Sequence, residues 1–114
     1  MRIIIKWLAM AASILAAAYV IPGVAVDGLK TALILAVVLG LINLVIKPIL
    51  ILVTLPVNIL TLGLFTFVIN ALLILLASSI VKGFEVDGFL TALLFGVVLS
   101  IFNFVLIKIV DPKD

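Results

Sequence analysis

The chain alternates between long apolar runs and short breaks that contain charges, prolines or glycines. The apolar runs predict helices at about residues 3–21, 28–54, 61–81 and 88–110. A helix of about 20 apolar residues spans the roughly 30 Å hydrocarbon core of a bilayer. The pattern therefore predicts an all-α integral membrane fold, with four transmembrane helices in a single membrane domain over residues 1–114.

Prolines mark the breaks in this pattern. The first helix ends where Pro22 and Gly23 prevent its continuation, and Pro48 either kinks or restarts the second. Residues 49–62 form an uncharged connector that is too interrupted to span a bilayer alone. Because unpaired backbone amides are not tolerated against lipid, we expect helical turns here, with the second helix continuing to about Thr54 and a break at Leu55-Pro56.

The stretch from Gly23 to Val45 returns sixty positions later without a gap. Twelve of the twenty-three aligned positions are identical: Gly23, Val26, Asp27, Gly28, Thr31, Ala32, Leu33, Val37, Val38, Leu39, Asn43 and Val45. The sequence thus predicts a duplicated two-helix hairpin, with residues 1–48 as the first repeat and 61–110 as the second. Two spans per unit make this a parallel repeat, with its pseudo-twofold axis along the membrane normal.

The first helix also has features of a secretory signal. Arg2 and Lys6 precede an apolar run that ends in the small residues Ala16-Ala17-Ala18. The repeat favours retention of the segment instead, since five of its residues have similar or identical partners sixty positions later. These are Trp7, Ala11, Ile14, Leu15 and Ala17, opposite Phe67, Ala71, Ile74, Leu75 and Ala77.

Two short segments between helices alternate in the manner of a strand. Residues 24–26 and 84–86 occupy equivalent places in the two repeats, and a twofold axis along the normal would make them antiparallel. We expect them to pair as an external clasp. Asp27 and Asp87 follow them, where a carboxylate can cap the next helix. The alternative role for these acids, cation binding, lacks further ligands.

Basic residues set the expected orientation. Arg2, Lys6, Lys47, Lys108 and Lys113 fall on the face that holds both termini and the connector, whereas Lys30 and Lys82 fall on the other. The positive-inside rule places both termini in the cytoplasm, although a dual topology stays open.

Composition excludes most other classes of protein. The chain is 68% hydrophobic and 11% charged, with a mean hydropathy of +1.71, so its solvent is lipid. It has no cysteine and no histidine, which removes disulfides, thiol chemistry and imidazole ligands. A net charge of +2 is too small to suggest nucleic acid. We expect no enzyme, no cofactor and no metal site.

Small residues recur at a spacing of four in the second helix of each repeat. Ala36 and Gly40 correspond to Gly96 and Ser100. Such a spacing lines one helix face and lets two backbones approach closely. The sequence predicts that these two helices cross at the pseudo-axis; use of the same face for homo-oligomerisation is the alternative.

Three asparagines lie within the predicted spans. Asn43 and Asn103 are equivalent in the two repeats, and Asn70 lies in the third helix. An amide that faces lipid is costly, so Asn43 and Asn103 are expected to bond each other as a structural clamp. The alternative makes all three the polar lining of a conduction or substrate path. The spans contain no acid, which a proton-coupled exporter would need.

Several motifs together resemble the phage holin superfamily IV, whose members have four membrane spans. The motifs are Ile46-Lys47-Pro48-Ile49-Leu50, Leu55-Pro56-Val57-Asn58, Thr61-Leu62-Gly63-Leu64-Phe65, Asn70-Ala71 and Gly83-Phe84-Glu85-Val86-Asp87-Gly88-Phe89. The resemblance covers nearly the whole chain and implies an integral membrane protein of the bacterial envelope without catalytic residues. It leaves three functions open: a self-associating, holin-like protein; a compact channel or transporter; and an accessory subunit in envelope maintenance.

Overall fold

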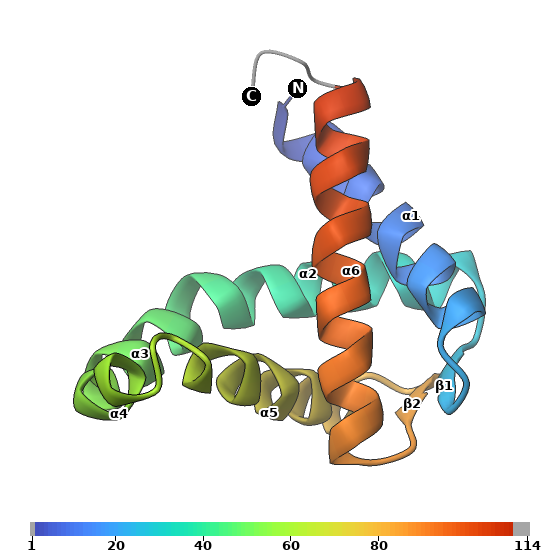
Figure 1. Ribbon diagram of the computed structural model, residues 1–114. Helices are drawn as coiled ribbons and strands as arrows, with labels where there is room; N and C mark the ends of the chain where they lie inside the picture. Colours follow the sequence, from blue (N-terminus) through green and yellow to red (C-terminus); the bar gives the residue numbers. More distant parts are fainter. Residues whose placement is uncertain (1, 111–114) are drawn as a thin grey trace.

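The computed structural model describes residues 2–110. Its elements in order are α1 (Arg2–Val20), β1 (Val24–Val26), α2 (Leu29–Leu41), the π-helical turn η1 (Ile42–Ile46), α3 (Lys47–Val53), α4 (Leu55–Leu60), α5 (Phe65–Ile80), β2 (Phe84–Val86) and α6 (Phe89–Val110). Figure 1 shows that α1 and α6 run together toward the chain ends, whereas α2 and α5 extend in another direction toward α3 and α4.

Three helical segments are long and apolar enough to cross a membrane: Arg2–Val20, Leu29–Val53 and Phe89–Val110. The fourth, α5, has 16 residues and is about 24 Å long, shorter than a typical hydrocarbon core. The expected start of this helix at residue 61 is wrong, because Leu62 and Gly63 adopt positive φ angles of 58° and 88° and break the helix before Phe65.

The two strands join the halves of the chain. β1 pairs antiparallel with β2, with Val24 opposite Val86 and Val26 opposite Phe84, which is the pairing that the sequence predicts. Two further hydrogen bonds extend the ladder symmetrically: the Asp27 amide donates to the Gly83 carbonyl, and the Asp87 amide donates to the Gly23 carbonyl, each at 2.8 Å. We call this region, residues 23–27 and 83–87, the clasp.

Glycine is required at both corners of the clasp. Gly23 and Gly83 have φ angles of +93° and +90°. A Cβ atom on Gly83 would lie 2.8 Å from the Asp27 Cβ, and one on Gly23 would lie 3.0 Å from the Asp87 Cβ. Both the backbone conformation and the close approach of the opposite chain therefore exclude a side chain.

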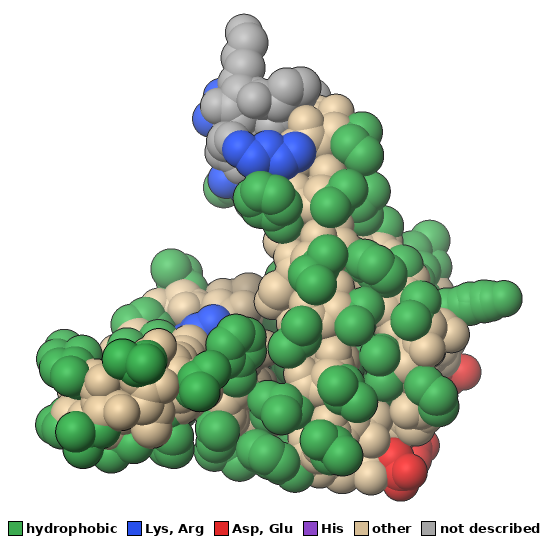
Figure 2. Space-filling model, in the orientation of Figure 1, with side chains coloured by type: hydrophobic (Ala, Val, Ile, Leu, Met, Phe, Trp, Pro, Cys, Tyr) green, Lys and Arg blue, Asp and Glu red, His purple; other side chains and the backbone are tan. Residues whose placement is uncertain are grey.

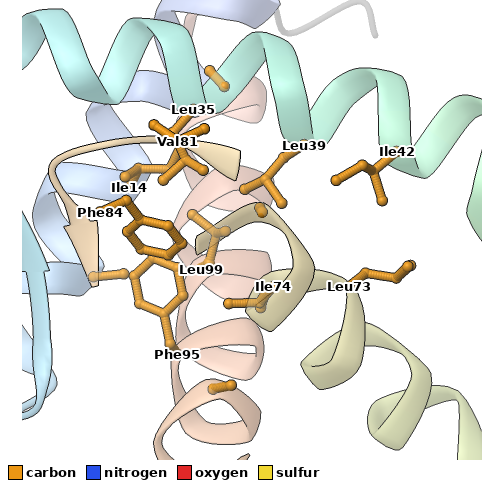
Figure 3. Packing of buried hydrophobic residues seen from close by; sticks show 14 of the residues in the cluster. Ile14, Leu35, Leu39, Ile42, Leu73, Ile74, Val81, Phe84, Phe95 and Leu99 are labelled. Atoms are coloured by element: carbon orange, nitrogen blue, oxygen red, sulfur yellow. The ribbon is translucent and has the colours of Figure 1, made fainter. Parts of the chain in front are cut away.

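The helices form two arms that meet at the clasp. The first arm consists of α1 packed along α6; the second consists of α2, η1 and α3, with α5 beside them. Near the clasp, α1 also packs on α2, and α5 packs on α6. The core lies at this junction, where the rings of Phe84 and Phe95 are tilted by 45° with their centroids 5.7 Å apart and the surrounding aliphatic side chains are buried (Figure 3).

The order of buried and exposed positions repeats along the chain at the same offset of sixty residues as the sequence. Residues 11–20 and 71–80 have the same order of buried, half-buried and exposed positions, and residues 31–40 and 91–100 differ at one position alone. Ala11, Ile14 and Ala17 are buried on α1 where Ala71, Ile74 and Ala77 are buried on α5. The first helix of each hairpin therefore buries an equivalent face.

Pro48 explains why α2 does not continue into α3 as one regular α-helix. Pro48 has no amide hydrogen, and its ring conflicts with the carbonyl four residues earlier in a regular α-helix. The helix forms a wider turn at this point, in which the Lys47 amide donates to the Ile42 carbonyl, five residues back. This is the hydrogen bond of a π-helical turn. The helix continues as α3 to Val53, close to the expected limit at Thr54.

The connector folds as a short helix held by polar side chains. Asn58 is buried; its Nδ2 donates to the Thr54 hydroxyl at 3.3 Å, and its Oδ1 accepts from the Thr66 hydroxyl at 3.1 Å. The Gly63 amide also donates to the Asn58 carbonyl at 2.7 Å. The Gly63 bond satisfies a carbonyl in the last turn of α4, and the side-chain bonds of Asn58 hold the turn into α5.

Candidate functional site

A groove lies between the two arms. Its volume is about 830 Å³, and residues of α1, α2, η1, α3, α5 and α6 line it. The space-filling view in Figure 2 shows the hollow between the arms, open on the side away from the clasp. We call this feature the inter-arm groove.

The three intramembrane asparagines all line the inter-arm groove. Asn43 comes from η1, Asn70 from α5 and Asn103 from α6. The expected clamp between Asn43 and Asn103 is not formed: no hydrogen bond joins them among residues 2–110, and the Asn103 Oδ1 is buried without a protein partner. The splayed arms account for this, because they hold α2 and α6 apart at this level.

The small residues have different surroundings from those expected. Ala36, Gly40 and Ser100 line the groove, and a Cβ atom on Gly40 would have no atom within 4 Å. A Cβ atom on Gly96 would instead collide with the Asn70 amide and lie 3.0 Å from the Ile74 Cδ1, both on α5. The predicted crossing of α2 and α6 on this face is therefore wrong, since α6 packs along α1 and α5.

The aspartates do not cap their helices through their carboxylates in the expected way. Gly28 occupies the N-cap position of α2, and no side chain bonds there. The Ala32 and Ala92 amides donate to the carbonyls of Gly28 and Gly88. Each helix thus begins two residues after the aspartate, at Leu29 and Phe89, and the aspartate's backbone amide instead extends the clasp.

The clasp end of the molecule is the acidic end. Asp27, Glu85 and Asp87 are exposed there, and Figure 2 shows the acidic side chains at this end. Within the described residues, no group of three or more His, Cys, Asp or Glu side chains is arranged to hold a metal ion.

Basic residues border the opposite end of the groove. Lys6 lies near the start of α1, Lys108 near the end of α6, and Lys47 directly after the π-helical turn, and all three line the groove. The Lys108 Nζ lies 5.5 Å from the centre of the Phe104 ring, and Phe104 also lines the groove. Within residues 2–110, none of the side chains that line the groove is acidic.

The floor of the groove is apolar and closed. Leu39, Ile74 and Leu99 line it and are almost fully buried, at 2–6% exposure. Figure 3 shows these side chains next to the core at the junction, with Leu35, Phe84 and Phe95 on the clasp side of them. The groove is therefore blind toward the clasp.

Trp7 is a groove residue that sequence reasoning does not single out as functional. Its indole Nε1 donates to the Leu33 carbonyl at 2.9 Å, which ties α1 to α2, and its ring lines the groove. The available signal was its place one residue after Lys6, since tryptophan beside basic residues is typical of a membrane interface.

Apolar helices long enough to cross a bilayer, joined at a clasp and separated by a groove with a basic mouth, define a multi-pass membrane protein. The chain belongs to the family described as mycobacterial 4 TMS phage holin, superfamily IV, which matches residues 1–105. This agrees with the resemblance seen in its motifs.

Two relatives support the same assignment. The uncharacterized membrane protein YvlD of Bacillus subtilis is 42% identical over 94 residues, which cover 81% of this chain and 79% of the relative. The uncharacterized protein SCO3922 of Streptomyces coelicolor is 46% identical over 88 residues, which cover 74% of this chain and 70% of the relative. No solved structure matches the chain significantly.

Proposed function

We propose that the protein is a non-catalytic, self-associating protein of the bacterial cytoplasmic membrane. The observation that carries this is the thin internal packing of the spans. In the most apolar windows of Arg2–Val20, Leu29–Val53 and Phe89–Val110, 28%, 22% and 22% of the residues are buried within the chain. Each span therefore uses one narrow stripe for internal contacts, and the rest of its circumference is left for lipid or for other copies.

The absence of catalysis rests on the residue types present. Without histidine or cysteine, the chain lacks the commonest general base and the most nucleophilic side chain. The polar groups that line the groove are amides, a serine hydroxyl and lysines. Such groups bind and orient a ligand, but no base adjoins the hydroxyl to activate it.

The proposed architecture is a parallel duplication with both termini in the cytoplasm. The reciprocal hydrogen bonds of the clasp and the repeated burial order support the pseudo-twofold axis. The larger number of lysines and arginines at the groove mouth supports the orientation. Because the chain has no cysteine, single-cysteine variants at Glu85 and Asp114 give a clean labelling test. An impermeant maleimide should label only Glu85→Cys from outside intact cells; outside labelling of Asp114→Cys would overturn the orientation.

Self-association is tested by energy transfer between donor- and acceptor-labelled copies in liposomes. The efficiency should rise as protein density increases and fall when unlabelled protein is added in excess. An efficiency no higher than that of randomly distributed monomers, at every density, would overturn the proposal. Release of large dyes with a steep dependence on protein density would further indicate holin-like assembly.

A second candidate function, a solute or ion path, is favoured by the common location of Asn43, Asn70 and Asn103 in one groove. Because the groove is blind, conduction would require Leu39 and Leu99 to move away from the floor. Ion-selective flux at low protein density, without release of large dyes, would support a path. Leu39→Ala should then increase the flux, whereas Leu52→Ala, at an exposed position of α3, should leave it unchanged.

A further inference from the structure

We propose that the far end of the second arm, formed by α3, α4 and the turn into α5, is embedded among lipid acyl chains and does not stand in water. We call this region, residues 48–65, the apolar tip. The connection between the second and third membrane helices therefore turns back inside one leaflet. The proposal goes beyond self-association, because it assigns a partner and a depth to a segment that a simple four-span topology leaves in water.

The first argument is the lack of charge around the apolar tip. Residues 48–81 contain no Asp, Glu, Lys, Arg or His, so no charged side chain separates the second helical span from the third. Each connection at the clasp, by contrast, contains charged side chains, such as Asp27 and Asp87. Charged residues typically mark the places where a membrane protein leaves the hydrocarbon. The connection through the apolar tip lacks that marker.

The exposed side chains of the apolar tip are the second argument. Adjacent residues of a helix point about 100° apart, so the exposure of both Leu52 and Val53, and of both Ile59 and Leu60, extends around the helices. A protein partner covers one face, whereas acyl chains reach every side. Figure 2 shows hydrophobic side chains over this end of the second arm. Six aliphatic side chains of the tip are 64–93% exposed: Leu52, Val53, Ile59, Leu60, Leu62 and Leu64.

The polar side chains of the apolar tip form hydrogen bonds within the chain. The Thr54 and Thr61 hydroxyls donate to backbone carbonyls four residues earlier, at 2.7 and 3.0 Å. The Asn58 side chain bonds the hydroxyls of Thr54 and Thr66. Hydrocarbon offers no hydrogen bonds, so polar groups that lie in it need partners in the protein. Thr54, Asn58 and Thr61 meet this requirement.

The backbone of the turn also has internal partners. Each amide from Thr61 to Phe67 donates a hydrogen bond within the chain, although this stretch is not one regular helix. Where no carbonyl is in place, a side chain replaces it, since the Phe65 amide donates to the Thr61 hydroxyl at 3.2 Å. Irregular backbone at membrane depth is tolerated only where the protein satisfies its polar groups. The turn is therefore suited to a surrounding without water.

Leu62 combines a turn conformation with a fully presented apolar side chain. Its φ angle is 58°, and it is 93% exposed. The left-handed conformation is strained for leucine and favours glycine, asparagine or aspartate. In water, exposure of the side chain would add to that strain, whereas contact of the side chain with acyl chains is favourable. Leucine at this position therefore indicates an apolar surrounding.

The length of α5 sets the depth of the apolar tip. α5 has 16 residues and is about 24 Å long, whereas the hydrocarbon core is about 30 Å thick. With its last residues at the clasp-side surface, next to Lys82, α5 ends short of the other surface. Tilt shortens its reach further, and the diverging arms cannot both lie along the membrane normal (Figure 1). Because α3 and α4 both contact α5, the whole tip stays at this depth.

Site-directed spin labelling distinguishes acyl chains, water and protein as the surroundings of the apolar tip. The chain has no cysteine, so Leu60→Cys and Leu62→Cys can each carry one nitroxide in liposomes at low protein density. Two relaxation agents are compared on both sides of the bilayer: oxygen, which concentrates in hydrocarbon, and a neutral, polar nickel complex, which stays in water. Glu85→Cys in the clasp and Leu72→Cys, an exposed position within α5, give reference values for water and hydrocarbon.

The ratio of oxygen to nickel accessibility at both tip positions should exceed the ratio at Glu85→Cys by at least about tenfold, because a polar complex is costly to transfer into hydrocarbon. It should be closer to the ratio at Leu72→Cys. A ratio like that of Glu85→Cys would place the tip in water. Low accessibility to both agents would place it against another protein surface, and either result overturns the proposal.

Thiol reactivity provides a second measurement on unlabelled protein. A thiol reacts with maleimide as the thiolate, which hydrocarbon disfavours. With membrane-permeant N-ethylmaleimide, Leu60→Cys and Leu62→Cys should react at least about tenfold more slowly than Glu85→Cys. Unfolding in sodium dodecyl sulfate should make the three rates similar, which shows that the difference comes from the folded position of the tip. Equal rates in folded protein in liposomes would contradict the proposal.

Neither measurement depends on the proposed orientation or self-association. Both agents and the maleimide reach the two sides of the bilayer, so an inverted or monomeric protein would give the same values. Failure of the energy-transfer or cell-labelling experiments would therefore leave the depth of the apolar tip intact. An apolar tip found in water would likewise leave those proposals intact.

Discussion

The second helix of each hairpin begins with the same residues and ends with a different shape. From Gly23 to Val45 and from Gly83 to Val105, twelve of twenty-three positions are identical. Yet α2 passes into a π-helical turn at Ile42, whereas α6 is one α-helix from Phe89 to Val110. The sequence difference that explains this change of shape lies three residues beyond the matched stretch, where Pro48 stands opposite Lys108.

This comparison separates two tasks of the repeated sequence. The shared residues build the clasp and the core junction, which require reciprocal contacts and therefore equivalent residues in both copies. The residues that differ shape the groove. Pro48 bends the wall formed by α2 and α3, and Lys108 lies near the end of the wall formed by α6. Gly96 leaves room for the Asn70 side chain, whereas its counterpart Ala36 lines the groove. Shared residues also line the groove, namely Leu39 with Leu99 and Asn43 with Asn103, so the residues that differ alter its shape rather than supply all of its lining.

Breaking the shared part should have the largest effect. Gly83→Val places a β-branched residue at φ +90° with its Cβ 2.8 Å from the Asp27 Cβ, and should cost roughly 3 kcal/mol or more. Gly23→Val should cost less, because its closest contact is 3.0 Å. Unfolding by sodium dodecyl sulfate in mixed micelles, followed by circular dichroism, measures both.

Ala25→Val is the control for the clasp, because Ala25 is an exposed strand residue that suits a β-branched side chain. It should leave the stability within about 0.5 kcal/mol. A Gly83→Val protein as stable as this control would show that the clasp does not hold the halves together.

Glycines at non-equivalent places on the two walls should respond unequally. Gly96→Leu must displace the Asn70 amide and should cost about 2 kcal/mol, whereas Gly40→Leu enters open space and should cost less than about 0.5 kcal/mol. Asn70→Ala should restore part of the loss in a Gly96→Ala background, because it removes the colliding amide. Equal stability of the two leucine variants would contradict the difference between the walls.

The three long apolar helices could be predicted from the sequence because they follow from apolar length, and the pairing of residues 24–26 with 84–86 because it follows from alternation. The internal duplication stays a prediction that rests on sequence identity. Sequence reasoning placed six polar or small residues, Ala36, Gly40, Ser100, Asn43, Asn70 and Asn103, that line one groove. It could not find the groove itself, because the angle between arms depends on how tightly the core side chains pack at the junction. It therefore expected Asn43 to meet Asn103, and α2 to cross α6.

The misplaced caps have a related cause. Asp27 and Asp87 stand where capping residues are common, but Gly28 and Gly88 follow them with φ angles of +108° and +125°. A positive φ lets the chain turn from strand into helix within one residue, so each helix starts directly after the glycine. The start of α5 was misplaced similarly, because Leu62 adopts a left-handed conformation that is unusual for leucine.

Removing the bend should make the walls more alike. Pro48→Ala restores a backbone donor, so the π-helical turn can become α-helical, and the protein should gain up to about 1 kcal/mol. Spin labels at Ile34→Cys and Leu52→Cys would be about 27 Å apart along a straight helix. Their distance distribution should shift toward that value in Pro48→Ala; an unchanged distribution would mean that tertiary contacts, not the proline, impose the bend.

The smallest effect is expected at the asparagines that occupy equivalent sequence positions in the two repeats, Asn43 and Asn103. Asn103→Leu removes a buried acceptor that has no protein donor, so it should change the free energy of unfolding by less than about 0.5 kcal/mol in neutral detergent. Asn58→Leu is the comparison, since it breaks bonds to Thr54 and Thr66 and should cost about 1 to 2 kcal/mol. A loss in Asn103→Leu as large as in Asn58→Leu would restore the structural clamp. A negligible loss would mean that this repeated amide does not stabilise the fold.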